Sequence, residues 1–212
     1  NQKQLTFHKS LTMGKAISPD GTLLAYAALV RNGWVIQVQS LVTGGRLPFF
    51  NPPGTLNWTP DFTPDGKRLL FASNTAREGS QEILIAGIDG RGIDRLTFRG
   101  RANVEPRVNP KTGAEVAFVS DASGLPQIYK MSMEGADVQR LTNGEGEAVN
   151  PAWHPDGQHL AFAWTRGFAP GNYNIFVMDV ATREVIQLTY GAGRNENPYW
   201  APDGRHIVFS SN

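Results

Sequence analysis

A tight turn followed by an apolar run is found in the stretch His154-Pro155-Asp156-Gly157-Gln158-His159-Leu160-Ala161-Phe162-Ala163-Trp164. The same pattern recurs along the chain, and its turn prolines are Pro19, Pro64, Pro110, Pro155 and Pro202. Successive prolines are 45, 46, 45 and 47 residues apart. A nearly constant step of this size is typical of a propeller or a solenoid.

The turn residues Pro-Asp-Gly explain how each repeat joins two antiparallel strands. Proline pre-sets φ at the second turn position, aspartate suits the third, and glycine accepts the positive φ that ends the turn. Metal binding or acid catalysis would be the alternative role for the aspartates. Because turn geometry alone accounts for them, we expect turn roles for Asp20, Asp65, Asp156 and Asp203.

Composition excludes several functional classes. The chain has 212 residues, enough for one all-β domain, and its 20 Lys and Arg against 19 Asp and Glu give no basic field for nucleic acid. Cysteine is absent, which excludes disulfides, thiolate catalysis and cysteine-ligated zinc. No apolar run reaches the ~20 residues of a membrane helix, so we expect no direct membrane insertion. The N-terminus does not resemble a signal peptide, so we expect a mature or excised piece.

The repeats predict an all-β fold, a β-propeller of four-stranded antiparallel blades. We expect one domain, 1–212, with complete blades at 15–50, 59–98, 105–142 and 150–190 and partial blades at 1–8 and 197–212. The partial blade 1–8 would hold a strand near residues 3–7, and no long helix is expected. A truncated six-bladed ring, which at roughly 46 residues per blade would need about 276, is favoured. A closed five-bladed ring is the alternative.

An apolar residue precedes each turn proline by two positions. These residues are Ile17, Phe62, Val108, Trp153 and Trp200. Because every repeat places an apolar side chain there, we expect them to pack against a neighbouring blade. An aromatic binding cage is the alternative for the two tryptophans.

The chain resembles the TolB family in the run Asn195-Glu196-Asn197-Pro198-Tyr199-Trp200-Ala201-Pro202-Asp203-Gly204. The strand 175–179 and the segment Gln187-Leu188-Thr189 extend the likeness, and Glu105-Pro106 followed by residues 117–130 is similar to the TolB propeller in particular. The resemblance covers essentially the whole chain. It implies a periplasmic protein of the Tol-Pal system, with a small N-terminal α/β domain before a six-bladed propeller.

The resemblance also implies partners and roles. TolB propellers bind the peptidoglycan-associated lipoprotein at the channel mouth, and other Tol proteins are further partners. The family supports outer-membrane integrity and cell division. Its role in protein transport is exploited by bacteriocins during their import, and its members are not enzymes. We therefore expect a monomeric, cofactor-free binding protein.

The same resemblance indicates which residues face the partner. TolB proteins use the loops that enter each innermost strand, here 56–59, 103–105, 148–150 and 195–197. The best matches are Leu56, Thr59, Val104 and Glu105, and the further candidates are Asn150, Glu196 and Asn197. Lys15 stands where the other repeats have proline, so the first loop matches less well. The alternative is that Asn150, Asn195 and Asn197 bond only local backbone as turn residues.

An enzyme, an enzyme's propeller or a ligand-sensing propeller is the rival interpretation. The sequence contains no Gly-x-Ser-x-Gly elbow and supports no serine-histidine-acid set. Metal-dependent propeller lyases use histidines that converge on the channel, whereas His154, His159 and His206 lie in or beside turns. We expect solvated histidines at the rim, with a metal site as the alternative.

Overall fold

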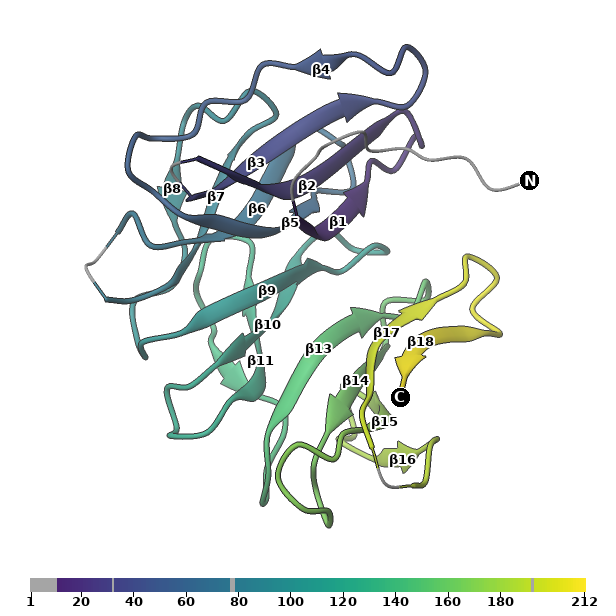
Figure 1. Ribbon diagram of the computed structural model, residues 1–212. Coiled ribbons are helices and arrows are strands. Elements are labelled where there is room, and N and C mark those ends of the chain that lie inside the picture. Colours follow the sequence, from purple (N-terminus) through teal and green to yellow (C-terminus); the bar gives the residue numbers. More distant parts are fainter. Residues whose placement is uncertain (1–10, 32, 77–78, 192) are drawn as a thin grey trace. The chain divides into compact units, whose positions relative to one another are not determined.

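The computed structural model describes residues 11–31, 33–76, 79–191 and 193–212 (Figure 1). The secondary-structure elements in these ranges are all β-strands, so the predicted all-β class is confirmed there. The described residues include no helix long and apolar enough to span a membrane. The strand expected near residues 3–7 and the partial blade 1–8 lie outside these ranges. The chain divides into two compact units, Asn1–Phe98 and Arg99–Asn212.

The first unit contains two four-stranded antiparallel sheets with their strands in chain order. The strands are β1 (Thr12–Ile17), β2 (Leu23–Val30), β3 (Gly33–Ser40), β4 (Arg46–Leu47), β5 (Asn57–Phe62), β6 (Arg68–Ser73), β7 (Glu82–Gly87) and β8 (Asp94–Arg95). Both faces of β2 and β6 are buried, as the continuous apolar runs predict. Ile36, Phe62 and Phe71 belong to a core shared by the two sheets.

The second unit contains two more such sheets and a two-stranded one. Its strands are β9 (Asn103–Val108), β10 (Glu115–Ser120), β11 (Gln127–Ser132), β12 (Gln139–Arg140), β13 (Ala148–Trp153), β14 (His159–Trp164), β15 (Asn174–Asp179), β16 (Val185–Gln187), β17 (Asn195–Trp200) and β18 (Ile207–Ser211). The rings of Phe162, Trp164 and Phe176 contact one another in its core. Ile128 of the preceding sheet joins the same cluster, so adjacent sheets share one core.

The predicted turn chemistry is confirmed in all four Pro-Asp-Gly turns. Their glycines have φ between 67° and 72°, a region that side chains rarely adopt. One carboxylate oxygen of Asp156 accepts the amide of Gln158 at 2.7 Å. The other three turn aspartates make the equivalent bond, to Thr22, Lys67 and Arg205. The aspartates therefore stabilise the hairpins that link the first and second strands of each sheet.

In three of the sheets a threonine just after the fourth strand anchors the end of that strand, and Thr97 and Thr142 are buried. Thr142 accepts the amide of Ile128 at 3.0 Å and donates its hydroxyl to Gln127 Oε1 at 2.7 Å. Thr97 and Thr189 make the equivalent pairs of bonds. Because the fourth strands have only two or three residues, these side-chain bonds supplement a short backbone ladder.

The prediction that each residue two before a turn proline is covered by a neighbouring blade is wrong for Ile17. Phe62, Val108 and Trp153 are buried, but 54% of Ile17 is exposed. Phe62 packs against the preceding sheet, and no described sheet precedes β1. Trp200 is half-buried and stands against the ring of His154, 4.5 Å between centroids, so packing rather than an open aromatic cage describes it.

Candidate functional site

The candidate partner-binding residues lie in strands, not in the loops that the sequence predicted. The innermost strands β5, β9, β13 and β17 begin at Asn57, Asn103, Ala148 and Asn195. Each strand keeps its pairing across the candidate segment because a β-bulge absorbs the irregular residues. In β13, for example, pairing stops at Val149 and resumes at Ala152. Of the seven candidates, only Leu56 precedes its strand.

A residue with positive φ sits at the bulge of every innermost strand. Thr59, Glu105, Asn150 and Asn197 have φ of 46°, 56°, 54° and 53°. Each of them directly precedes a proline, a position that normally favours extended backbone. In β1 the equivalent residue is Gly14, with φ of 52°, so the first repeat bulges even though Lys15 replaces the proline.

Within the second unit, three bulge residues form a hydrogen-bonded row across adjacent edge strands. The amide of Asn150 donates to Glu105 Oε2 at 2.7 Å, and its Nδ2 donates to Glu105 Oε1 at 3.0 Å. Asn150 Oδ1 accepts the amide of Asn197 at 3.2 Å. The side chains of Glu105 and Asn150 thus each satisfy an edge-strand amide of the next sheet, which is otherwise available for pairing. We call Glu105, Asn150 and Asn197 the bulge row.

The alternative that the asparagines only bond nearby turn backbone is therefore wrong. Asn150 bonds residues 45 and 47 positions away, and Asn197 Nδ2 donates to Ser210 Oγ at 3.2 Å. Asn195 Nδ2 reaches Asn174 Oδ1 at 3.3 Å. All of these contacts join separate strands or sheets, so the asparagines link elements that are distant in sequence.

Glu105 is the titratable member of the bulge row, and its surroundings shift the pKa of its carboxyl group. Desolvation raises its pKa above the ordinary value, against the opposing effects of Arg107 and of the two hydrogen bonds from Asn150. Arg107 itself donates to the carbonyl of Pro106 at 2.9 Å. The bulge row therefore presents a partly buried acidic group flanked by amides.

Glu196 lies in a second polar group beside the row. Arg194 donates to both of its carboxylate oxygens, at 2.6 and 2.9 Å. The guanidinium of Arg194 also stands 5.4 Å from the ring centre of Tyr173, whose hydroxyl donates to Glu147 at 2.5 Å. The sequence analysis did not single out Arg194, Tyr173 or Glu147. Desolvation and the bond to Glu147 raise the pKa of Tyr173.

The remaining candidates have different surroundings. Leu56 and Thr59 belong to the first unit, where a side chain at Gly33 or Gly14 would collide with them. Val104 is partly buried and packs against the core of the second unit. The structure therefore brings Glu105, Asn150 and Asn197 into direct contact, whereas Val104 is held by apolar packing.

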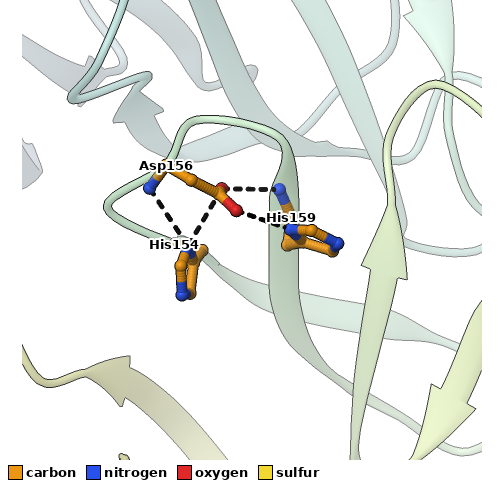
Figure 2. Close-up of side chains that lie close together, drawn as sticks. All are labelled: His154, Asp156 and His159. Atoms are coloured by element: carbon orange, nitrogen blue, oxygen red, sulfur yellow. Dashed lines mark hydrogen bonds and ion pairs between the residues drawn. The ribbon is translucent and has the colours of Figure 1, made fainter. Parts of the chain in front are cut away.

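The prediction of solvated histidines is confirmed for His206 and wrong for His154. The His206 side chain is 74% exposed and that of His154 only 20%. His154 is covered because its ring packs on Trp200 and its Nε2 lies 2.9 Å from the carbonyl oxygen of Gly204. Figure 2 shows His154 and His159 on either side of Asp156, at the turn between β13 and β14.

Family and sequence comparisons place this geometry among known proteins. The family model described as the TolB beta propeller domain matches residues 1–150 and 141–212. An uncharacterized protein of Agrobacterium fabrum is 29% identical over 156 residues, covering 68% of this chain and 52% of that protein. The Tol-Pal system protein TolB of Bordetella pertussis is 32% identical over 121 residues, or 57% of this chain and 27% of that protein.

Solved structures agree with the fold. TolB from Acinetobacter baumannii matches with a TM-score of 0.82 and 28% identity, covering 96% of this chain and 49% of that one. An oligogalacturonate lyase in complex with manganese matches with a TM-score of 0.69 and 19% identity, covering 99% and 61%, and this likeness shows the fold alone. The chain spans about half or less of the length of these TolB proteins and of the Agrobacterium relative. The predicted β-propeller class is confirmed, and the chain belongs to the TolB β-propeller domain family.

Proposed function

We propose that the chain is a non-enzymatic protein-binding scaffold of the Tol-Pal cell-envelope system. It acts in the periplasm, where its inner-strand bulges bind the peptidoglycan-associated lipoprotein. The family match and the relative named as a Tol-Pal system protein support the system. Through that complex it contributes to outer-membrane integrity, cell division and protein transport, with other Tol proteins as further partners.

The observation that carries the proposal is the repeated backbone strain at one position of the blade. Non-glycine residues with positive φ cost of order 1–3 kcal/mol each, and they gather at sites where a ligand is clamped. Here four of them occupy equivalent places directly before a proline, at Thr59, Glu105, Asn150 and Asn197. Within the second unit, Glu105, Asn150 and Asn197 are hydrogen-bonded to one another, which supports a single binding surface there.

The polar character of the bulge row favours a protein partner over a small apolar ligand. Glu105 and Asn150 offer a carboxylate and amide groups on edge strands, the mixture of donors and acceptors that polar protein interfaces use. Asn197 is exposed, and Glu196 is oriented by Arg194. We also propose Leu56, Thr59 and Val104, each within its own unit, as residues that contact the lipoprotein.

A pull-down with the soluble domain of the lipoprotein tests the proposal. The wild-type chain should retain the lipoprotein, and Glu105→Gln should weaken retention because one charged acceptor is lost. Asn197→Gly is a second test variant, because glycine tolerates the positive φ at that exposed position and the fold is kept.

Glu134→Gln is the matched control, since Glu134 is an exposed glutamate in the turn between β11 and β12. Thermal unfolding of each variant confirms that it is folded. If the folded wild-type chain retains no lipoprotein, or if Glu105→Gln and Asn197→Gly both retain as much as Glu134→Gln, the proposed site is wrong.

The rival function is an enzyme that shares the propeller fold. Its support is the likeness to the oligogalacturonate lyase, which at 19% identity reaches only the fold. A lyase assay on oligogalacturonate and a peptidase assay on casein distinguish the two functions. Turnover that survives repeated purification would contradict the scaffold, whereas lipoprotein binding without turnover supports it.

A further inference from the structure

We propose that His154, Asp156 and His159 form a binding site for a divalent transition-metal ion, with zinc as the ion that fits best. His154 Nδ1 lies 2.9 Å from Asp156 Oδ1, and His159 Nδ1 lies 2.8 Å from Asp156 Oδ2 (Figure 2). One ligand atom from each residue lies within 4.8 Å of the others. A single ion can therefore reach all three.

The ligand types select the class of ion. Two imidazole nitrogens and one carboxylate oxygen suit zinc and its neighbours in the first transition row, whereas calcium and magnesium require an all-oxygen shell. Three protein ligands leave one position of a tetrahedral zinc for water. The exposed fractions of the three side chains, 20%, 33% and 39%, allow that water to reach the ion.

Both histidines direct Nδ1 toward the carboxylate of Asp156. In neutral histidine one ring nitrogen donates and the other accepts, and a metal ligand usually donates its second ring nitrogen to an acceptor. The Nε2 of His154 faces the carbonyl oxygen of Gly204 at 2.9 Å, and the Nε2 of His159 faces Asp179 Oδ2 at 3.9 Å. The acceptor at Nε2 of His154 therefore favours a free lone pair at its Nδ1. His159 Nδ1 instead donates to the carboxylate of Asp156 at 2.8 Å, so it must lose that proton when it binds the ion.

The ring of His154 is closely packed on two sides. A Cβ atom at Gly204 would lie 2.5 Å from His154 Nε2, so the glycine permits the close approach of the ring. Trp200 packs edge-to-face on the same ring. Coordination requires that His154 Nδ1 exchange its hydrogen bond from the amide of Asp156, at 3.0 Å, for the metal. It also requires that His159 Nδ1 lose the proton it shares with Asp156 Oδ2.

The site is separate from the bulge row. Asn150 precedes His154 by four residues, which is roughly 13 Å along an extended strand. Metal binding would therefore survive changes that abolish lipoprotein binding, and the two proposals can fail independently.

The next repeat provides a natural control for the third ligand. In it Asp203 and His206 make the same pair, with 3.1 Å between Oδ2 and Nδ1, but Ala201 replaces the histidine. The second turn thus offers two ligands where the first offers three. Zinc should bind the first turn and not the second.

Equilibrium dialysis of the metal-stripped chain against zinc chloride, with metal analysis of the protein, tests the proposal. We expect one zinc per chain, and a tetrahedral visible spectrum when cobalt is used as the probe. His159→Gln should weaken binding by at least about tenfold, and His154→Gln should do the same. His206→Gln is the control and should keep the wild-type stoichiometry and affinity.

Thermal unfolding checks that each variant is folded. The check matters most for His154→Gln, because His154 also packs on Trp200. His159, whose side chain is more exposed, keeps the test decisive if the His154 variant does not fold. No bound zinc in the wild-type chain would overturn the proposal. Equal zinc binding by wild type, His159→Gln and His206→Gln would overturn it too, because the ion would then be held elsewhere.

Discussion

Asn150 holds the carboxylate of Glu105 with two hydrogen bonds, from its backbone amide at 2.7 Å and from Nδ2 at 3.0 Å, across 45 residues of sequence. The contact joins the bulges of β9 and β13, so the edge strands of two consecutive sheets are bound through their strained residues. This pairing makes the bulge row a structural unit as well as the proposed binding surface.

Two substitutions at Asn150 separate strain from hydrogen bonding. Asn150→Gly removes the Nδ2 donor but suits the positive φ, whereas Asn150→Ala removes the donor and adds strain. We expect Asn150→Ala to be less stable than Asn150→Gly by about 1 kcal/mol. Urea unfolding of both variants measures the difference, and equal stabilities would show that the backbone at this position is not strained.

The stability of the chain should depend on pH through Glu105. Its pKa in the folded state is raised, so the folded protein binds more protons than the unfolded one between the ordinary value of 4.5 and the raised value. The contribution of this carboxyl to the free energy of unfolding is therefore fully present below pH 4.5 and falls as the pH rises through that window. Glu105→Gln lacks this titration, so we expect the stability difference between wild type and variant to change with pH in that direction. A difference that stays constant with pH would contradict the assignment.

Thr142, the buried threonine that follows β12, should contribute more to the free energy of unfolding than an exposed threonine. Thr142→Val leaves the amide of Ile128 and the side chain of Gln127 without their present partner. We expect a loss of about 2–3 kcal/mol in the free energy of unfolding, because buried polar groups are costly when unsatisfied. Thr12→Val, at an exposed position of β1, is the control and should change stability by less than about 0.5 kcal/mol. A similar effect of both variants would refute the anchoring role.

Equivalent phenylalanines of two repeats should contribute unequally to the free energy of unfolding. Phe162 and Phe209 each lie three residues after equivalent histidines, His159 and His206, but Phe162 is fully buried and Phe209 is 44% exposed. We expect Phe162→Ala to cost about 3–5 kcal/mol, and Phe209→Ala to cost less than about half as much. Denaturant midpoints measure both, and equal costs would show that these repeats are covered alike.

The local features of the blades could be predicted from the sequence. A Pro-Asp-Gly turn followed by an apolar run depends on a few adjacent residues, so its recurrence was enough to give the strands, the turn aspartates and the propeller class. The bulges required more than local information, because they arise from pairing with the second strand. A signal was nevertheless present, since glycine and asparagine, which tolerate positive φ, occupy equivalent positions at Gly14, Asn150 and Asn197.

The misjudged residues have partners far away in the chain. The sequence predicts a solvated His154, yet Gly204, 50 residues further on, and Trp200 cover it. The sequence predicts a covered Ile17, yet its side chain is exposed because no described sheet precedes its own. Repeat spacing predicts which residues are equivalent, but the coverage of each one depends on what its neighbouring repeat contributes.

The central claim is that the bulge row holds a protein partner, and calorimetric titration with the soluble domain of the peptidoglycan-associated lipoprotein tests it most directly. The account predicts saturable one-to-one binding by the wild-type chain, weakened at least about tenfold, or 1.4 kcal/mol, by Glu105→Gln and left unchanged by Glu134→Gln. No heat of binding from the folded wild-type chain, or the same affinity for all three proteins, would contradict it.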